Sequence, residues 1–403
     1  MTAGRLRTLD ELGDVAGTRV FLRVDLNVPL ADGSVADDSR IVAAMPTIDE
    51  LRERGAALVL ASHLGRPKGA PRDDLRTGVL ADALTRLLAG SASVQALGMP
   101  DERETIDAVG RLGPGELAML ENLRFDPGEE ANDPRFAGRL AELADAYVDD
   151  AFGAVHRAHA SVEALPELML ASGRPAVAGR LVQKEVEVLG SLLQGPERPY
   201  VAVLGGAKVS DKLGVIDALI RRVDDVLIGG AMAFTLLAAE GASVGRSRVE
   251  DDRLEDVRGI RRTAEAEGVR IELPTDVVAA AEPSLDAPRA TVPAREIPED
   301  VMGLDIGRAT VDAFARIIAD AKTVLWNGPM GVFELEPFSE GTRGVALAIA
   351  SANAFSVVGG GDSIAAVRRA GLEGAFDHLS TGGGASLEFL EGRPLPGITI
   401  LED

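Results

Sequence analysis

Six basic residues lie at turn-like positions in the first half of an acidic chain: Arg23, Arg40, His63, Arg66, Arg124 and Arg157. Four of them belong to the segments 23–29, 62–67 and 121–125, which fall at or just after the end of a predicted strand. Ligands of open α/β sheets bind beyond the carboxyl ends of the strands, and guanidinium groups match the geometry of phosphate and carboxylate groups. Together the six residues predict a site for a small polyanion, although each arginine alone would indicate only a solvated surface charge.

Asp25 and Asn27 alternate along a predicted strand, which directs both side chains to the same face. Turn chemistry at the end of a strand would account for this pair, and so would hydrogen bonds to the hydroxyl groups of a substrate. His156 and His159 stand three residues apart, but the acidic ligand pattern of a zinc site is missing near them. We therefore expect no metal ion at these histidines.

Two lysines follow a glycine turn at the start of the second half. The predicted strand 201–204 runs into Gly205 and Gly206, and Lys208 and Lys212 follow at a spacing of four. We expect a helix over residues 211–222, with both lysines on one helix face and an N-terminus that favours phosphate. A glycine turn followed by two exposed lysines is the alternative explanation.

Further glycine-rich turns lie towards the C-terminus. Residues 359–364 (GGGDSI) follow a predicted strand and include Asp362, a carboxylate able to hold Mg²⁺. Residues 380–386 (STGGGAS) suit either a hinge or a close approach to phosphate, and residues 326–334 add a loop that could surround a base and ribose. The chain has no P-loop motif, and its G-x-G-x-x-A match at residues 113–118 precedes a predicted strand instead of following one.

The elements that must position these residues are short aliphatic strands that alternate with helices. Strands are predicted at residues 20–24, 57–61, 117–120 and 146–148, and again at 201–204, 225–228, 323–326 and 354–358. Helical patterns intervene, for example at residues 44–54 and 211–222. This alternation predicts an α/β fold with parallel sheets covered by helices on both faces.

The length of 403 residues exceeds what one hydrophobic core usually supports, so two domains are expected. Between the two halves, apolar residues recur at helical spacing over residues 181–194, which predicts an interdomain helix. We place a first domain at residues 1–180, the helix and linker at 181–198, a second domain at 199–380, and a C-terminal hinge and tail at 381–403.

The overall composition narrows the class of function. The chain has 64 acidic and 42 basic side chains and a net charge of −22, which disfavours binding to nucleic acid or anionic membranes. The chain has no cysteine, which excludes disulfides and thiol catalysis. The N-terminus lacks the apolar run of a signal peptide, and the uncharged stretch 344–361 fits a helix and a strand better than a membrane span. We expect a cytoplasmic protein.

Eight segments resemble, in order, the signatures of the phosphoglycerate kinase family: residues 23–29, 62–67, 121–125, 156–161, 205–212, 325–334, 359–363 and 380–388. The resemblance implies two Rossmann-like domains around a central cleft. It also implies phosphoryl transfer between 1,3-bisphosphoglycerate and ADP, which gives 3-phosphoglycerate and ATP, with Mg²⁺ accompanying the nucleotide. The family further implies a monomer whose C-terminal tail returns to the first domain.

Residue by residue, the resemblance assigns a substrate site to Asp25, Leu26, Asn27, Arg40, His63, Leu64, Gly65, Arg66, Arg124 and Arg157. It assigns a nucleotide site to Lys208, Lys212, Gly303, Glu334, Gly360, Gly361, Asp362 and Ser363. Asp362 is the implied metal ligand, and Ser363 stands where many relatives carry threonine but keeps the hydroxyl. The implied catalytic residues are Arg40, Lys208, Gly361 and Gly384.

The implied reaction needs no general base, because a carboxylate or phosphate oxygen attacks without losing a proton. The lack of a Ser-His-Asp or kinase His-Arg-Asp arrangement agrees with this. Arg40 and Lys208, together with Mg²⁺ and glycine-loop amides, would align and neutralise the transferred group. Closure about residues 181–194 and 380–386 would exclude water from the reaction.

Three other interpretations share parts of this pattern. A nicotinamide dehydrogenase has the same architecture, but its glycine fingerprint and following acidic residue are missing. A solute- or phosphate-binding protein also has two α/β lobes, but it has little reason for two separate phosphate cradles. A catalytically inactive scaffold is disfavoured because all the matched site residues are present.

Overall fold

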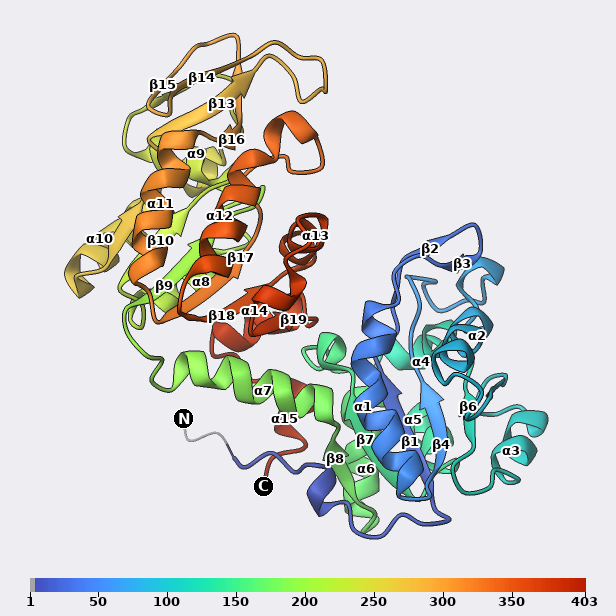
Figure 1. Ribbon diagram of the computed structural model, residues 1–403. Helices are drawn as coiled ribbons and strands as arrows, with labels where there is room; N and C mark the ends of the chain where they lie inside the picture. Colours follow the sequence, from blue (N-terminus) through green and yellow to red (C-terminus); the bar gives the residue numbers. More distant parts are fainter. Residues whose placement is uncertain (1–3) are drawn as a thin grey trace. The chain divides into compact units, whose positions relative to one another are not determined.

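The structure, a computed structural model, describes residues 4–403 and divides into two compact units (Figure 1). Unit 1 takes in the chain up to Glu187 together with the C-terminal segment Pro394–Asp403, and unit 2 comprises Val188–Arg393. The boundary falls inside helix α7 (Arg180–Leu193). Helix α14 (Gly384–Leu390), which the sequence grouped with the C-terminal tail, lies in unit 2.

Unit 1 is built on a parallel six-stranded sheet in the order β5-β6-β4-β1-β7-β8. Its strands are β1 (Arg19–Val24), β4 (Ala57–Ala61), β5 (Val94–Ala96), β6 (Leu117–Met119), β7 (Ala146–Asp150) and β8 (Ala176–Ala178). β1 lies at the centre, where the strand order reverses between β4 and β7, and ligands of such sheets bind at this point. Arg23 of β1 and Asp149 of β7 are register partners there.

Alternation along β1 separates two layers of core. Leu22 packs with Ile48 of α1 (Ser39–Glu53) and Leu84 of α2 (Gly78–Leu87). Phe21 points to the opposite face and stacks on Tyr147, with ring centroids 6.0 Å apart. Because side chains alternate along a strand, Arg23 also points to the Phe21 side. The same alternation that builds the core therefore directs a buried arginine towards the carboxyl end of the sheet.

The other elements of unit 1 surround this sheet (Figure 1). They are β2 (Leu30–Ala31), β3 (Ser34–Val35), α3 (Arg103–Val109), α4 (Pro127–Glu130), α5 (Pro134–Ala141), α6 (Leu165–Ala171) and α15 (Pro396–Thr399). Short helical turns are η1 (Leu9–Glu11), η2 (Asp73–Leu75), η3 (Leu123–Phe125), η4 (Phe152–Ala154) and η5 (Ala160–Ala164). The turns η3, η4 and η5 carry or flank most of the polar residues described below.

Unit 2 has a second parallel sheet in the order β12-β10-β9-β17-β18-β19. The strands are β9 (Tyr200–Leu204), β10 (Asp225–Ile228), β12 (Arg270–Glu272), β17 (Thr323–Asn327), β18 (Phe355–Gly359) and β19 (His378–Ser380). The helices are α8 (Leu213–Ile220), α9 (Met232–Ala239), α10 (Leu254–Glu267), α11 (Arg308–Asp320), α12 (Glu340–Ser351), α13 (Gly361–Arg369) and α14, with turns η6 (Asp251–Arg253), η7 (Glu336–Phe338) and η8 (Glu373–Ala375). Trp326 of β17 is fully buried in the core of this unit.

A small antiparallel sheet distinguishes unit 2 from unit 1. It contains β13 (Asp276–Ala280), β14 (Arg289–Pro293) and β16 (Met302–Ile306), and a short pair, β11 (Ser243–Val244) and β15 (Glu296–Ile297), lies nearby in the fold (Figure 1). The sequence analysis did not predict these strands. β14 is largely exposed, so it lacks the continuous apolar run that revealed the parallel strands.

The predicted α/β fold class is confirmed, and all eight predicted strands are present. Helix α1 begins at Ser39 instead of residue 44, so Arg40 lies in a first helical turn and not in a loop. Pro46 obscured this start, because proline is favoured near the beginning of a helix rather than inside it. No helix among residues 4–403 is long and apolar enough to cross a membrane.

Candidate functional site

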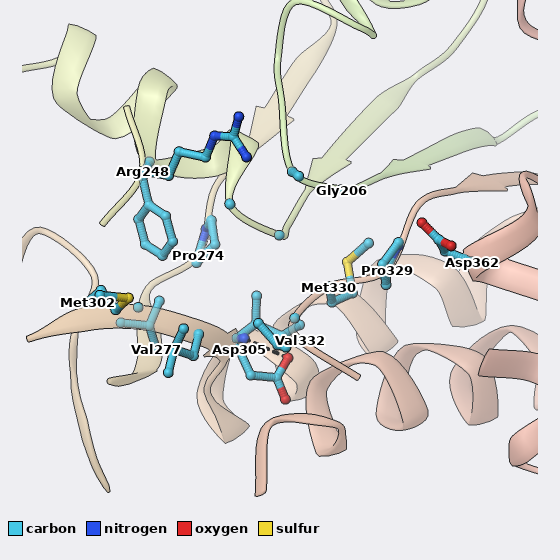
Figure 2. A pocket seen from close by; sticks show the side chains of 18 of the residues that line it. Gly206, Arg248, Pro274, Val277, Met302, Asp305, Pro329, Met330, Val332 and Asp362 are labelled. Carbon is cyan, nitrogen blue, oxygen red and sulfur yellow. Dashed lines mark hydrogen bonds between the residues drawn. The ribbon is translucent and has the colours of Figure 1, made fainter. Parts of the chain in front are cut away.

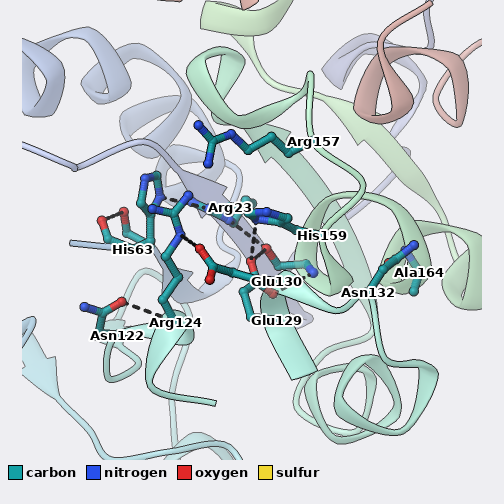
Figure 3. A network of polar contacts seen from close by, with 12 residues as sticks. Arg23, His63, Asn122, Arg124, Glu129, Glu130, Asn132, Arg157, His159 and Ala164 are labelled. Atoms are coloured by element: carbon teal, nitrogen blue, oxygen red, sulfur yellow. Dashed lines mark hydrogen bonds and ion pairs between the residues drawn. The ribbon is translucent and has the colours of Figure 1, made fainter. Parts of the chain in front are cut away.

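Arg23 forms the centre of a polar cluster at the carboxyl end of β1, although its side chain is fully buried (Figure 3). Its Nε donates to Oγ of Ser161 over 2.9 Å, and Nη1 donates to the carbonyl oxygen of Val24 over 2.6 Å. Nη2 lies 3.1 Å from Nδ1 of His63. A guanidinium group can only donate, so Nδ1 accepts and the neutral His63 ring carries its proton on Nε2.

The pKa of His63 shows that several arginines converge on this cluster. Burial lowers this pKa well below its usual value, and the charges of Arg23, Arg124 and Arg40 lower it further. His63 is therefore a neutral imidazole near pH 7. Three of the five first-half arginines that the sequence placed together thus act on one buried ring.

His159 and Arg157 extend the cluster towards η5. Burial lowers the pKa of His159 to about 3, and among the charges Arg124 contributes most. Arg157 donates from Nε to Nε2 of His156 over 3.1 Å and remains half-buried. Both His63 and His159 are accordingly held neutral among cations, which is the environment expected of a site that awaits an anion.

Arg124 and Asn122 join two of the signature segments. Nη1 of Arg124 donates to the carbonyl oxygen of Gly65 over 3.0 Å, and Nε lies 3.3 Å from Oε1 of Glu130. Oδ1 of Asn122 accepts from the N–H groups of Arg124 and Leu64 at 3.2 and 3.3 Å. Asn122, whose role the sequence analysis missed, therefore ties residues 62–67 to residues 121–125.

Asp25 and Asn27 are bonded within the protein. Asp25 forms an ion pair with Arg40 and accepts from the N–H of Asn27 over 3.2 Å. Oδ1 of Asn27 accepts from the N–H of Gly65 over 2.8 Å. A Cβ atom at Gly153 would lie 2.2 Å from Oδ2 of Asp25, so only glycine fits against this ion pair. These contacts orient Arg40 and the segment that contains His63.

Arg66 differs from the other arginines of the cluster. It is exposed and makes no hydrogen bond or ion pair with any residue between 4 and 403. Leu26 and Leu64, in contrast, are fully buried, and the N–H of Leu26 donates to Oγ of Ser62 over 3.0 Å. The two leucines therefore support the site through their backbone and packing, whereas Arg66 is available for a ligand.

Two buried acids stand behind the arginines. Oε1 of Glu129 accepts from Oγ of Ser161 over 2.6 Å, and burial raises the pKa of Glu129. Asp149 accepts from the hydroxyl of Tyr147 over 3.2 Å, and burial raises its pKa to about 6. The charge of Arg23 opposes the rise in both pKa values. Sequence reasoning missed both, because acids are abundant in this chain and neither belongs to a distinctive motif.

Unit 2 contains a cavity of about 280 Å³ (Figure 2). Its walls combine glycine backbone, such as Gly206 and Gly230, with apolar side chains. Gly303, Glu334 and Asp362 from the predicted nucleotide site also line it. A mostly apolar cavity with a few polar groups is the usual form of a small-molecule site.

Glycines allow two turns to press together at this cavity. The N–H of Gly205 donates to the carbonyl oxygen of Asn327, and that of Gly206 donates to Pro329, both over 3.0 Å. Gly328 has a φ of +98°, and a Cβ there would lie 2.1 Å from the carbonyl oxygen of Gly205. No other residue fits at Gly328 without displacing the turn.

Lys208 and Lys212 do not share a helix face, so this expectation was wrong. Helix α8 begins at Leu213, after both lysines. The carboxylate of Glu250 accepts from the N–H groups of Val209 and Ser210, which holds the preceding residues in a loop. A side chain forty residues away thus fixes backbone groups that a helix would otherwise have used.

The two lysines consequently face different surroundings. Lys212 is hydrogen bonded to Oδ1 of Asn327, and burial lowers its pKa to about 8 although Asp211 and Asp362 oppose the decrease. Lys208 is exposed and has no hydrogen-bond or ion-pair partner in the described part of the chain. Lys212 is therefore fixed in place, and Lys208 can turn towards a ligand.

The turn after β18 presents the first residues of α13. Gly360 has a φ of +91°, Gly361 begins the helix and Asp362 is exposed in its first turn. Ser363 is fully buried, and its Oγ accepts from the N–H of Gly328 over 2.6 Å. The Ser363 hydroxyl thus supports the neighbouring turn, and Gly384 stands apart at the start of α14.

Asp362 suits a metal ion that arrives with a ligand. No cluster of three His, Asp or Glu residues that could hold a metal occurs among residues 4–403. Mg²⁺ commonly binds through one or two carboxylates and completes its shell with substrate phosphates and water. Asp362 is an exposed carboxylate that lines the cavity and acts electrostatically on Lys212, which fits this arrangement.

Two further residues at the cavity were missed by sequence reasoning. Arg248 lines the wall, and Asp305 lies on its floor with both carboxylate oxygens bonded to backbone N–H groups. Burial raises the pKa of Asp305 to about 8. Neither residue belongs to a motif, and both reach the cavity only through the antiparallel sheet and its connections.

Comparisons with known proteins agree along nearly the whole chain. The model of a family described as phosphoglycerate kinase matches residues 9–393. A phosphoglycerate kinase of Thermus thermophilus is 54% identical over 398 residues, which cover 98% of this chain and 100% of the relative. One of Chlorobium phaeobacteroides is 52% identical over 391 residues, or 96% and 97% of the two chains.

Solved structures agree as well. The structure of phosphoglycerate kinase from Coxiella burnetii has a TM-score of 0.87 and 38% identity, and the match covers 98% of this chain and 99% of that one. The enzyme from Pyrococcus horikoshii has a TM-score of 0.86 and 34% identity, with 98% of both chains covered.

Proposed function

This chain belongs to the phosphoglycerate kinase family, and from that membership we propose how its residues divide the reaction between them. The reaction is the reversible transfer of a phosphoryl group between 1,3-bisphosphoglycerate and ADP, which gives 3-phosphoglycerate and ATP. In our proposal the arginine cluster of unit 1 binds the phosphoglycerate, and the cavity of unit 2 binds the nucleotide. The observation that supports this most strongly is the convergence of cations on a neutral His63 in a chain of net charge −22.

The triose site consists of arginines that differ in how many protein groups hold them. Arg66 has no partner in the described residues, so it binds the distal phosphate together with the half-buried Arg157. Arg40 is oriented by Asp25 and faces the reacting end of the substrate. His63 donates from Nε2, because Arg23 occupies its Nδ1. Preorganised donors of this kind align the substrate without rearranging when charge develops.

The nucleotide site relies on backbone and on few charges. The paired turns at Gly205 and Gly328 shape the wall beside the phosphates, and Lys212 stands behind them. Asp362 would hold the Mg²⁺, whose chemistry when bound is to neutralise the phosphate oxygens. Glu334 is exposed at the cavity and accepts from the ribose hydroxyls.

The transfer itself requires no proton. An oxygen of the ADP β-phosphate attacks the phosphorus of the acyl phosphate, and the bond from that phosphorus to the carboxyl oxygen breaks, which leaves a carboxylate. Arg40 and Lys208 neutralise the transferred group, and the N–H groups of Gly361 and Gly384 supply further donors. Because His63 and His159 are neutral far below pH 7, they serve as hydrogen-bonding groups and not as acids or bases.

Water must be excluded, since it would hydrolyse the acyl phosphate. We assign the exclusion of water to a closing movement about α7 and residues 380–386. We further propose that the protein is a monomer and works in the cytoplasm. Variants in α7 should lower turnover and leave the affinity for each single ligand unchanged. Loss of single-ligand affinity at normal turnover would contradict closure, and light scattering of the purified protein tests the monomer.

The decisive experiment is a coupled assay of ATP-dependent phosphorylation of 3-phosphoglycerate, with Mg²⁺ and with EDTA. We expect metal-dependent turnover that Arg40→Ala and Lys208→Ala each reduce by about 10²–10³. Matched controls are Arg103→Ala and Lys322→Ala, which remove exposed charges elsewhere in each unit. Turnover that survives EDTA, or controls as impaired as the site variants, would contradict the proposed roles.

A further inference from the structure

Arg248 is an unpaired cation at the nucleotide cavity. It lines the wall, is exposed, and makes no hydrogen bond or ion pair with any residue between 4 and 403. Glu250, two residues further on, feels its charge but is bonded to the loop after β9. In a chain with an excess of 22 negative charges, an arginine without an acidic partner at a cavity requires an explanation.

The backbone on both sides of Arg248 is fixed. Oγ of the preceding Ser247 accepts from the N–H of Gly303 over 2.9 Å, and the N–H of Glu250 donates to Oγ1 of Thr235 over 3.1 Å. The guanidinium is therefore attached to a rigid base, and its side chain alone is free to adjust. Such an arrangement suits a group that contacts a ligand with defined geometry.

The cavity has a polar end and an apolar end. Figure 2 shows Asp362 on one side, and Arg248 on the other with Pro274 and Met302. The phosphates belong at the Asp362 end, where Lys212 and the metal ligand lie. The base then belongs at the apolar end, beside Arg248.

We propose that an edge of the base faces the Arg248 guanidinium, and that this contact makes the protein use GDP and IDP better, relative to ADP, than it would without the arginine. The inference rests on the proposed function, because it concerns the same nucleotide site. Guanine and hypoxanthine present two adjacent acceptors, O6 and N7, which a guanidinium group can contact together. Adenine presents N7 beside the N6 amino group, which is a donor and cannot accept from arginine.

The test compares ADP, GDP and IDP in the wild type, Arg248→Leu and Arg248→Gln. IDP isolates the O6 and N7 edge, because hypoxanthine lacks the 2-amino group of guanine. In Arg248→Leu we expect kcat/KM to fall about three- to tenfold for GDP and IDP and by less than about twofold for ADP. Arg248→Gln should favour ADP further, because an amide matches the N6 and N7 edge of adenine.

Two outcomes would overturn the proposal. An equal decrease in kcat/KM for all three nucleotides in Arg248→Leu would mean that Arg248 contacts phosphate, ribose or the ring face. No decrease in kcat/KM would mean that Arg248 makes no contact with the nucleotide. Arg246→Leu is the matched control, since Arg246 is a neighbouring arginine that bonds to carbonyl groups outside the cavity. This variant should leave the ratio of GDP to ADP use unchanged.

Failure of the proposed function is distinguishable from failure of this inference. Calorimetric titration of each nucleotide into the three proteins measures base preference without any turnover. A wild type that phosphorylates 3-phosphoglycerate with none of ATP, GTP and ITP would refute the proposed function, whereas the ratio of binding constants would still decide the role of Arg248. Because the Arg248 side chain has no partner in the described residues, its variants should keep the wild-type melting temperature.

Discussion

In our proposal the two candidate sites of this molecule bind phosphate by different means. In unit 1 charged side chains dominate, and Arg23, Arg40 and Arg124 act on the buried His63. In unit 2 the cavity is formed by glycine turns and apolar side chains, with few charged residues in its wall, among them Arg248, Glu334 and Asp362. The difference follows from the ligands, because a small polyanion offers no apolar surface whereas a nucleotide offers a base.

The two sites also depend on different structural features of their units. Unit 1 must keep several cations together without a ligand, and buried acids such as Glu129 and Asp149 offset them. Unit 2 must bring backbone segments into contact, and glycines such as Gly328 allow this. Charge substitutions should therefore damage the first site most, and added methyl groups the second.

The largest effect is expected at Arg40. Replacement by alanine removes the cation nearest to Asp25 and should lower kcat by about 10²–10³, because a preorganised donor is lost. Arg40→Lys retains the charge but loses the planar fork, and it should recover only part of the rate. Measurement of kcat and of KM for 3-phosphoglycerate checks this. A variant with raised KM and normal kcat would assign Arg40 to ground-state binding only.

The second prediction concerns Gly328→Ala. The new Cβ would stand 2.1 Å from the carbonyl oxygen of Gly205, and the φ of +98° is unfavourable for alanine. We expect at least tenfold weaker nucleotide binding and about 2–4 kcal/mol lower stability of unit 2, with unchanged binding of 3-phosphoglycerate. Calorimetric titration of each ligand measures both affinities.

A matched glycine should behave in the opposite way. Gly259 lies inside α10, where a Cβ would meet only Nη2 of Arg262, at 3.8 Å. Gly259→Ala should therefore stabilise unit 2 by up to about 1 kcal/mol and leave nucleotide affinity unchanged. Equal losses of nucleotide affinity in both variants would show that the contact between the two turns is not what the site requires.

The comparison also explains what the sequence could predict. The parallel strands were found because continuous apolar runs reveal buried strands, and the cluster of arginines was anticipated because arginines stood at their ends. The loop that carries Lys208 could not be foreseen, because Glu250 holds its backbone from a distant part of the chain. Arg248 was missed for a related reason, since it reaches the cavity through tertiary structure alone.

The third prediction tests the cations of unit 1 through His159. Its pKa is about 3 in the folded protein and about 6.5 in the unfolded chain, so the unfolded chain binds more protons between these values. This contribution makes stability fall as the pH falls below about 6.5. His159→Gln removes this contribution, so the slope of unit 1 stability against pH should change by up to about 1 kcal/mol per pH unit.

Separate probes can localise this change. Hydrogen exchange of the β7 amides reports on unit 1, and fluorescence of Trp326 during urea unfolding reports on unit 2. We expect His159→Gln to alter the first signal between about pH 4.5 and 6.5 and to leave the second unchanged. An identical pH dependence of β7 exchange in wild type and variant would mean that His159 is not held neutral by its surroundings.

The last effect is expected at Asp150, where the pH dependence of stability has the opposite sign. Its Oδ1 accepts from the N–H of Leu181 over 2.8 Å, its Oδ2 is buried without a partner among the described residues, and burial raises its pKa to about 7. The folded protein therefore binds more protons than the unfolded chain between about 4 and 7, and stability is lost as the pH rises through this range. Asp150→Asn keeps the acceptor for α7 and removes the charge, so unit 1 should gain up to about 1 kcal/mol for each pH unit between 4 and 7, and nothing at pH 4. Because Asp150 opposes the effect of His159, β7 exchange in Asp150→Asn should become more sensitive to acid than in the wild type. Destabilisation of this variant at pH 8 would instead show that the negative charge, and not only the oxygen, holds the start of α7.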